Sequence, residues 1–339
     1  MDTSKAIKTK DYHIETLRGI AILLVVAGHV IGSAPDGGMK IDFPSPWRYL
    51  YLWIDYIQMP LFTAIAGWVY ALRPPQKKDF SSFISKKVLR LILPMITVGT
   101  IYFLMQYIIP GTNNKGNLSE IWRIYIFPYT IYWYLPSLFL IFLVTACVDI
   151  NKWINNFFSW FIFFILAYIL MAMRDIIIPE SIPNLLSFKG AISQMPYFIT
   201  GIGICRFSNY LYTKDYRIIY SIFAIIGLTF LQFEWFYSLY EYKWYESLPP
   251  FMVICTLILI FHFIYTNKFF IWIGHYAYTI YLFHVFGTSG GRIILKQIGI
   301  DNNIPIFIFS FILAVILPII VELILSKWKI TRILFLGKR

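Results

Sequence analysis

Arg18 and His29 are two chemically capable side chains within one otherwise apolar segment near the start of the chain. They are eleven residues apart, and at about 100° per residue in an α-helix both lie within roughly 20° of one face. The rise of about 1.5 Å per residue separates them by roughly 16 Å. A guanidinium binds phosphate or carboxylate, and a neutral imidazole accepts a proton near pH 7. A long anionic ligand could therefore contact both, although singly they are also explained as a topology anchor and a packing histidine.

The composition predicts that this helix lies in a membrane. Hydrophobic residues make up 59% of the 339 residues and charged residues 14%, whereas a soluble domain has about 25% charged residues. The apolar runs are too long, and lack the alternation, for a transmembrane barrel. We therefore expect an all-α integral membrane protein with about ten transmembrane helices of about 20 residues. The expected segments are 17–32, 49–72, 91–109, 125–148, 157–173, 191–205, 218–236, 249–266, 269–288 and 304–325.

The distribution of basic residues predicts the orientation of the chain. With the N- and C-termini both cytoplasmic, 20 of the 29 Lys and Arg residues fall on the inner side and nine on the outer side, in agreement with the positive-inside rule. This bias accounts for the net charge of +12 without a nucleic-acid partner. The loops between the expected spans are short, which leaves no room for a soluble catalytic domain. Residues 1–339 are therefore expected to form a single polytopic membrane domain.

Ionisable side chains inside apolar segments are costly, and they are functional candidates for that reason. Asp55 and Glu234 fall in the outer halves of their expected spans, where a carboxylate could orient His29 or contact a ligand. His284 is expected at about the depth of His29. Each of the three is also explained as an interfacial or packing residue. The three cysteines fall in or at the ends of different spans without metal-ligand spacing, so no metal site is expected.

Five motifs, in this order along the chain, give the sequence a family resemblance. They are ETLRGIAILLVVAGH with Arg18 and His29, QMPLFTAIAG at 58–67, KVLRLILP at 87–94, WYL at 133–135 and AYTIYLFH at 277–284. Together they resemble the acyltransferase 3 family of membrane acyltransferases, which O-acetylate surface polysaccharides and related glycans. The family commonly has His where this chain has Gln58, and Ser where it has Ala66. The resemblance covers most of the chain.

The resemblance implies an acyl-CoA-dependent O-acetyltransferase in the cytoplasmic (inner) membrane of a bacterium. The donor would be cytoplasmic acetyl-CoA, and the acceptor a hydroxyl of an exopolysaccharide or another surface glycan, or of its lipid-linked precursor. The phosphates of CoA need a basic mouth, for which Arg18, Lys86, Lys87 and Arg90 are the candidates. The last three are equally explained as an ordinary positive-inside loop. The extended pantetheine arm would then reach toward His29.

Acyl transfer to a hydroxyl needs a base and a donor for the oxyanion. His29 is the expected base, either in direct transfer or as a transient carrier of the acyl group, and both routes stay open. Trp133, Tyr134 and Tyr281 are the candidates for the oxyanion donor, although aromatic residues also form interfacial belts. His284 is a further candidate on the acceptor side.

Two other classes of membrane protein fit part of the pattern. A polysaccharide or glycolipid transporter, or a flippase without acyl transfer, also has many helices with polar residues near the midplane. A membrane glycosyltransferase would use Asp36 or Asp42 of the first outer loop as its acid or base. A purely structural subunit would leave the pairing of Arg18 with His29 unexplained.

Overall fold

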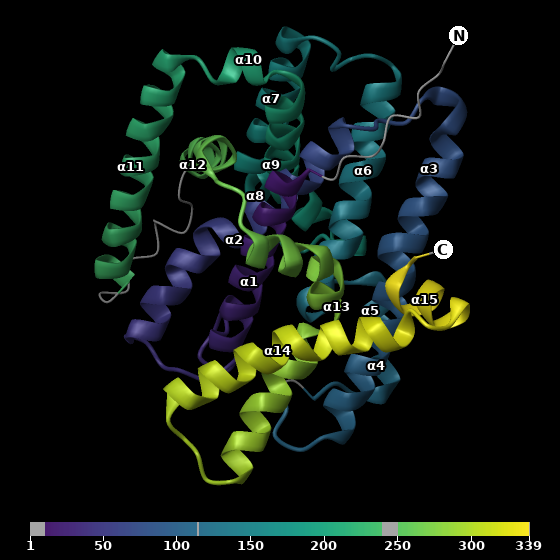
Figure 1. Ribbon diagram of the computed structural model, residues 1–339, viewed down its shortest axis with the longest axis vertical. Helices are drawn as coiled ribbons and strands as arrows, with labels where there is room; N and C mark the ends of the chain where they lie inside the picture. The colour runs from purple at the N-terminus through teal and green to yellow at the C-terminus, as the bar shows by residue number, and fades with distance from the viewer. Residues whose placement is uncertain (1–10, 114, 239–249, 339) are drawn as a thin grey trace.

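The protein is seen in a computed structural model that describes residues 11–113, 115–238 and 250–338, and those residues form helices with no strand (Figure 1). The α-helices are α1 (Tyr12–Ile31), α2 (Pro46–Ala71), α3 (Phe80–Lys87), α4 (Leu93–Ile108), α5 (Arg123–Ile126), α6 (Tyr134–Ile150), α7 (Phe157–Ala172), α8 (Arg174–Ile177), α9 (Phe188–Arg206), α10 (Ser208–Leu211), α11 (Lys214–Ser238), α12 (Pro250–Phe263), α13 (Lys268–Gln297), α14 (Asn303–Leu325) and α15 (Lys329–Leu336). Short 3₁₀ turns lie at Lys77–Asp79, Leu118–Glu120, Thr130–Trp133 and Leu185–Ser187, and a π-helical turn lies at Val88–Ile92.

Helices occupy all ten segments that the apolar pattern predicts, which confirms the all-α fold class. Within the described ranges, six helical stretches are long and apolar enough to cross a membrane, as a multi-pass membrane protein requires. They are Tyr12–Ile31, Lys77–Ile108, Leu118–Ile150, Lys214–Phe233, Lys268–Gln297 and Asn303–Leu325. Helices α7 and α12 are apolar but shorter.

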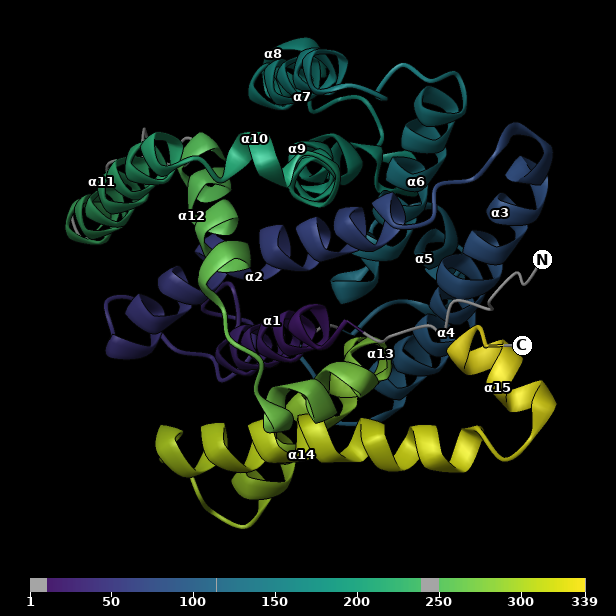
Figure 2. The ribbon, with the colours of Figure 1, turned by 45° about the horizontal axis from the view of Figure 1, so that its top comes forward.

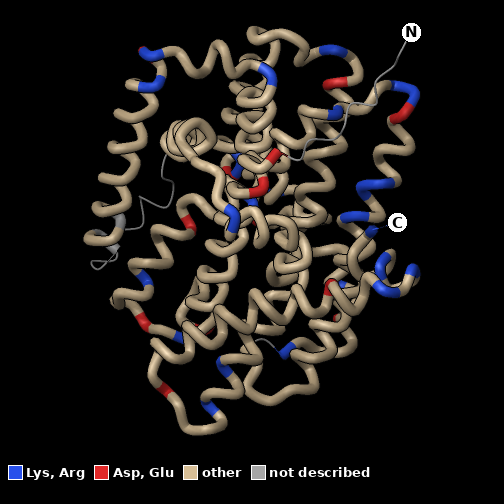
Figure 3. Tube along the Cα trace, viewed as in Figure 1, with Lys and Arg blue, Asp and Glu red and all other residues tan. Residues whose placement is uncertain are grey.

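The outer surface of the bundle is apolar in the way that a lipid-facing surface must be. Along α14, every fourth residue from Ile304 to Ile320 is an isoleucine that is about half exposed, so one whole side of this helix is an apolar stripe. An exposed apolar stripe that runs along most of a helix marks a surface that contacts a membrane or another apolar partner. Figure 3 shows the corresponding charge pattern, with long uncharged stretches along the helices and most charged residues near their ends.

Helix α1 lies inside the bundle and packs against both α2 and α13, while α13 packs in turn against α14 (Figures 1 and 2). Helices α1 and α13 run in the same direction, since Thr16 is hydrogen-bonded to Asn267 at one end and His29 contacts His284 at the other. Two glycines allow their backbones to approach closely. A Cβ atom on Gly19 would lie 2.1 Å from the Phe270 carbonyl oxygen, and one on Gly274 would lie 2.0 Å from that of Glu15.

A buried ion pair joins the ends of three other helices. The two carboxylate oxygens of Asp149, on α6, accept hydrogen bonds from Arg206, on α9, at 2.9 and 2.6 Å. The Tyr70 hydroxyl, on α2, donates a third bond to the same carboxylate at 3.0 Å. This bidentate geometry compensates both charges within an apolar bundle, and it holds α2 in register with α6 and α9.

Replacing Gly274 with Ala is expected to destabilise the protein by about 1–3 kcal/mol or more, because the new Cβ atom would force α13 away from α1. The measurement is the thermal unfolding midpoint of the detergent-solubilised variant. The matched control is Gly290→Ala on the same helix, where nothing lies within 4 Å of the added atom. An unchanged midpoint for Gly274→Ala would show that the two backbones are not in contact as described.

Candidate active site

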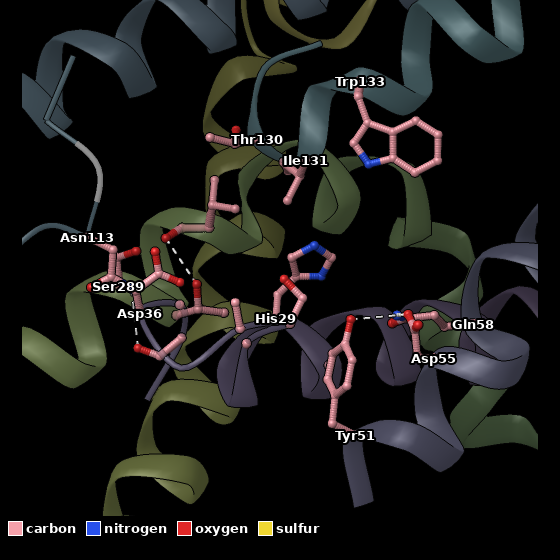
Figure 4. Close-up of a pocket in the computed structure, with 18 of the residues that line it drawn as sticks. His29, Asp36, Tyr51, Asp55, Gln58, Asn113, Thr130, Ile131, Trp133 and Ser289 are labelled. Atoms are coloured by element: carbon pink, nitrogen blue, oxygen red, sulfur yellow. Dashed lines mark hydrogen bonds between the residues drawn. The ribbon is translucent and has the colours of Figure 1, made fainter. Parts of the chain in front are cut away.

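His29 lies on the wall of a polar cavity of about 460 Å³ at one end of α1 (Figure 4). The wall is built by the loop that joins α1 to α2, by α2, by the 3₁₀ turn before α6 and by α13. The residues that line it are Gly28, His29, Gly32, Ser33, Ala34, Asp36, Gly37, Gly38, Tyr51, Asp55, Gln58, Met59, Tyr102, Gln106, Asn113, Thr130, Ile131, Trp133, Tyr281, Val285, Thr288, Ser289 and Arg292. Most of them carry polar groups that could bind a hydroxylated ligand.

The hydrogen bond of His29 to its own helix determines which nitrogen is the base. Its Nδ1 atom lies 2.7 Å from the Val25 carbonyl oxygen. A carbonyl oxygen only accepts hydrogen bonds, so we assign the proton of the neutral ring to Nδ1. The lone pair then lies on Nε2. A neutral imidazole in this tautomer can take a proton from a ligand bound in the cavity.

Asp55 supplies a carboxylate on the same wall as His29. It accepts hydrogen bonds from the Tyr51 hydroxyl at 3.2 Å and from the Gln58 side-chain amide at 2.7 Å (Figure 4). Gln58 packs directly on α1, since a Cβ atom on Gly28 would lie 2.7 Å from its Oε1 atom. Asp55 lies close enough to His29 for its charge to act on the imidazole. Gln58 thus links the Asp55 carboxylate to the residue that precedes His29.

His284 packs against His29 and is fully buried. The two ring centroids are 5.0 Å apart in an edge-to-face arrangement. The His284 Nδ1 atom bonds to the carbonyl oxygens of Ile280 and Tyr281, while its Nε2 atom has no hydrogen-bond partner within the part of the chain that the structure describes. His284 is not among the residues that line the cavity, so it supports the His29 ring from the side.

The three candidates for an oxyanion donor differ in how their polar groups are used. Trp133 lines the cavity, and its indole N–H has no hydrogen-bond partner among the described residues. Tyr281 also lines the cavity, but its hydroxyl donates to the Ile131 carbonyl. Tyr134 lies outside the cavity wall, with its hydroxyl hydrogen-bonded to Thr63 at 3.1 Å. Trp133 is therefore the one of the three with a donor available to a ligand.

The basic candidates gather near the other end of α1. Arg90 lies in the π-helical turn, and such turns are often found at functional sites. Its guanidinium stacks on the Tyr278 ring at 3.7 Å and donates to the Leu336 carbonyl at 2.6 Å. The Lys87 ammonium lies 3.4 Å from the centroid of the Phe142 ring. Both cations thus lie against aromatic rings, and neither forms an ion pair with a carboxylate of the described residues.

Arg18 lies near this cluster, and its charge acts on that of Arg90. It also forms an ion pair with Glu15 at 2.8 Å. Lys86 is exposed. None of the four basic candidates lines the cavity around His29, because Ile22 and the valines that follow it on α1 are fully buried between the two ends of the helix.

Some expected residues lie elsewhere, and some residues of the cavity were not expected. Glu234 falls in α11, but its side chain lies outside the described residues. Arg292 lines the cavity although it was predicted to lie in an outer loop. The expected span ended at residue 288, whereas α13 continues to Gln297, and Thr288 and Arg292 are buried in the protein interior. His284, Thr288 and Arg292 recur every four residues, and this spacing was the signal for a longer helix.

The comparisons with known proteins agree with this geometry. Residues 11–323 match a family model described as an acyltransferase domain. The chain belongs to the acyltransferase 3 family. It is therefore a membrane acyltransferase, as the five motifs predicted. No curated protein and no solved structure matches the chain significantly. Within the described ranges, no group of His, Cys, Asp and Glu side chains is arranged to hold a metal ion.

Substituting Asp55 with Asn is expected to lower the rate of acyl transfer about tenfold, or about 1.4 kcal/mol, because the negative charge that acts on His29 is lost. The Asn side chain keeps the size of Asp, so the Michaelis constant for the acyl donor should stay the same. Steady-state kinetics of the purified variant measure both values.

The matched control is Asp42→Asn, which removes an exposed carboxylate from the neighbouring loop outside the cavity wall. A full rate in the Asp55 variant would contradict a role for this carboxylate at His29. Loss of activity in the Asp42 variant would instead favour the glycosyltransferase interpretation.

Proposed function

We propose that the protein moves an acetyl group from cytoplasmic acetyl-CoA to a hydroxyl of a surface or exported polysaccharide, or of its lipid-linked precursor. The observation that carries this proposal is the arrangement along α1. A polar cavity with a neutral imidazole lies at one end of the helix, and a cluster of cations lies near the other. An acyl-CoA thioester has the matching form, with phosphates at one end and a reactive carbonyl at the other.

The cation cluster suits the nucleotide end of the donor. Arg18, Lys87 and Arg90 would bind its phosphates through charge-assisted hydrogen bonds, with the exposed Lys86 at the rim. Aromatic rings hold Lys87 and Arg90 without neutralising them. The separation of Arg18 and His29, roughly 16 Å along the helix, is of the order of the length of the pantetheine arm.

The acetyl transfer proposed at His29 uses only side chains of the protein and its two substrates. The Nε2 atom takes the proton of the acceptor hydroxyl as its oxygen attacks the thioester carbonyl. The Trp133 indole N–H donates to the oxyanion of the tetrahedral intermediate. When the intermediate collapses, the C–S bond breaks, the thiolate of CoA leaves, and the imidazolium returns its proton to that sulfur. An alternative route first places the acetyl group on His29 and then on the acceptor.

The same proposal includes the topology and location of the chain. Residues 1–339 form a single membrane domain of ten spans, with both termini in the cytoplasm and the cavity open to the outer side of a bacterial inner membrane. The bias of 20 inner to nine outer basic residues supports this orientation.

Substituting His29 with Ala is expected to lower acetyl transfer about 10²- to 10⁴-fold, the range for loss of a general base. The measurement is the release of free thiol from acetyl-CoA by the protein in nanodiscs, together with its thermal unfolding midpoint. The matched control is His275→Ala, since His275 is an exposed histidine of α13 outside the cavity.

Unchanged thiol release in a folded His29 variant would remove this residue from the mechanism. If the wild type neither binds nor consumes acetyl-CoA when glycan acceptors are supplied, the transporter or flippase interpretation takes its place.

Substituting Lys87 with Gln is expected to raise the Michaelis constant for acetyl-CoA about tenfold or more, because one charge-assisted bond to phosphate is lost. The same variant should use acetyl-pantetheine as the wild type does, since this donor has no phosphate. Lys78→Gln, which removes an exposed charge from the 3₁₀ turn before α3, is the control. An equal effect on both donors would show that Lys87 has a structural role only.

A further inference from the structure

Arg292 is a buried cation on the wall of the cavity. It lies on α13, eight residues after His284, so its side chain points to the same side of the helix two turns further on. The residue is 4% exposed, and it lines the same cavity as His29. A guanidinium carries five N–H donors and keeps its charge in proteins. Its burial requires an explanation, since an uncompensated charge in an apolar bundle is costly.

The hydrogen-bond partners of Arg292 are all neutral. Its guanidinium donates to the backbone carbonyls of Gly38 at 2.8 Å and Gly111 at 3.1 Å, and to the side-chain oxygen of Asn113. Across the part of the chain that the structure describes, Arg292 forms no ion pair with a carboxylate. The three oxygens hold the guanidinium in place, but they leave its positive charge uncompensated and two N–H donors unused.

Arg48 shows what a purely structural arginine looks like in the same region. It is also buried, and it donates to the carbonyls of Gly32, Ala34 and Ile41, which fixes the loop between α1 and α2. Arg48 does not line the cavity, and the carboxylates of Asp36 and Asp42 act on its charge. Arg292 differs on both points, since it lines the cavity, and the side chain that acts on its charge is Tyr102 and not a carboxylate.

The cavity wall carries charged groups on both sides of His29. In Figure 4, Tyr51, Asp55 and Gln58 lie on one side of His29, while Asp36, Asn113 and Ser289 lie on the other. Arg292 belongs to the Asn113 side through its hydrogen bond to that residue. The wall thus carries two carboxylates, and Arg292 lies on the side of Asp36, across the cavity from Asp55. A ligand placed with its negative charge at Arg292 would have a neutral hydroxyl free to approach His29.

We propose that the acceptor carries a negatively charged group next to the sugar hydroxyl that receives the acyl group, and that Arg292 binds this group. The shared chemistry is an anionic oxygen cluster, supplied either by the carboxylate of a uronic acid or by a phosphate ester. The unused N–H donors of the guanidinium match both. The proposal rests on the acyltransferase function proposed above and specifies the class of its acceptor.

The test compares matched acceptors with the wild-type protein in nanodiscs, so it does not depend on a variant that folds. Oligosaccharides of several hexoses are supplied in three forms that differ only at carbon 6, as the neutral alcohol, the carboxylate and the phosphate ester. Acceptor-dependent thiol release from acetyl-CoA gives kcat/KM for each form. In every series that is turned over, we expect kcat/KM for an anionic form to be at least tenfold higher than kcat/KM for its neutral counterpart.

The substitutions then assign the preference to Arg292. Arg292→Gln should give the same kcat/KM for the anionic and neutral forms. Arg292→Lys should retain part of the preference for the anionic form. The matched control is Lys296→Gln, which removes an exposed charge one turn further along α13 and should leave the ratio unchanged. Comparing the carboxylate with the phosphate ester shows which source the site prefers.

Two results would overturn the proposal. Neutral acceptors that perform as well as their anionic counterparts in the wild type would show that Arg292 only holds the loops together. An anionic preference that survives in a folded Arg292→Gln variant would place its origin elsewhere. Failure of the proposed acyltransferase function would give a different result. No acceptor, anionic or neutral, would then cause thiol release from acetyl-CoA.

Discussion

The spacing of Arg18 and His29 on a single helix is the constraint on which the proposed mechanism depends. Both side chains project from one side of α1, and the rise of the helix keeps them roughly 16 Å apart. No loop intervenes, so this separation cannot change without breaking α1. The helix is held in turn by α13, whose backbone it meets at Gly19 and Gly274, and by α2. Elements distant in sequence therefore serve to keep α1 straight and buried.

The two histidines at the cavity end of the bundle form hydrogen bonds to backbone carbonyls of their own helices. His29 bonds to the carbonyl of Val25, and His284 bonds to that of Ile280, in each case four residues earlier. This local bond selects the tautomer and directs Nε2 away from the helix. The two arginines at the cavity end bond to backbone carbonyls of the surrounding loops. A low-dielectric interior makes each of these bonds strong, and it also makes any uncompensated charge, such as that of Arg292, costly.

The helices could be predicted from the sequence because long apolar runs bounded by charges leave few alternatives. Arg18 and His29 could be singled out because helical periodicity alone places them on one face. Side-chain partners across helices could not be predicted, since packing decides them. Periodicity did not show that Gln58 joins Asp55 to Gly28, or that His284 lies beside His29 and not on the cavity wall. Arg292 was missed because a charge after two glycines resembles a loop, whereas the helix continues and buries it. The functional roles of these residues stay predictions.

The central claim is that an acyl group from one side of the membrane reaches an acceptor on the other side through His29. Its most direct test uses sealed proteoliposomes with the protein in one orientation, radiolabelled acetyl-CoA on the cytoplasmic side and a glycan acceptor enclosed on the opposite side. The proposed mechanism predicts labelled acetyl-glycan inside the vesicles with wild-type protein and none with the folded His29→Ala variant. Product formed only when donor and acceptor share one side of the membrane would contradict it.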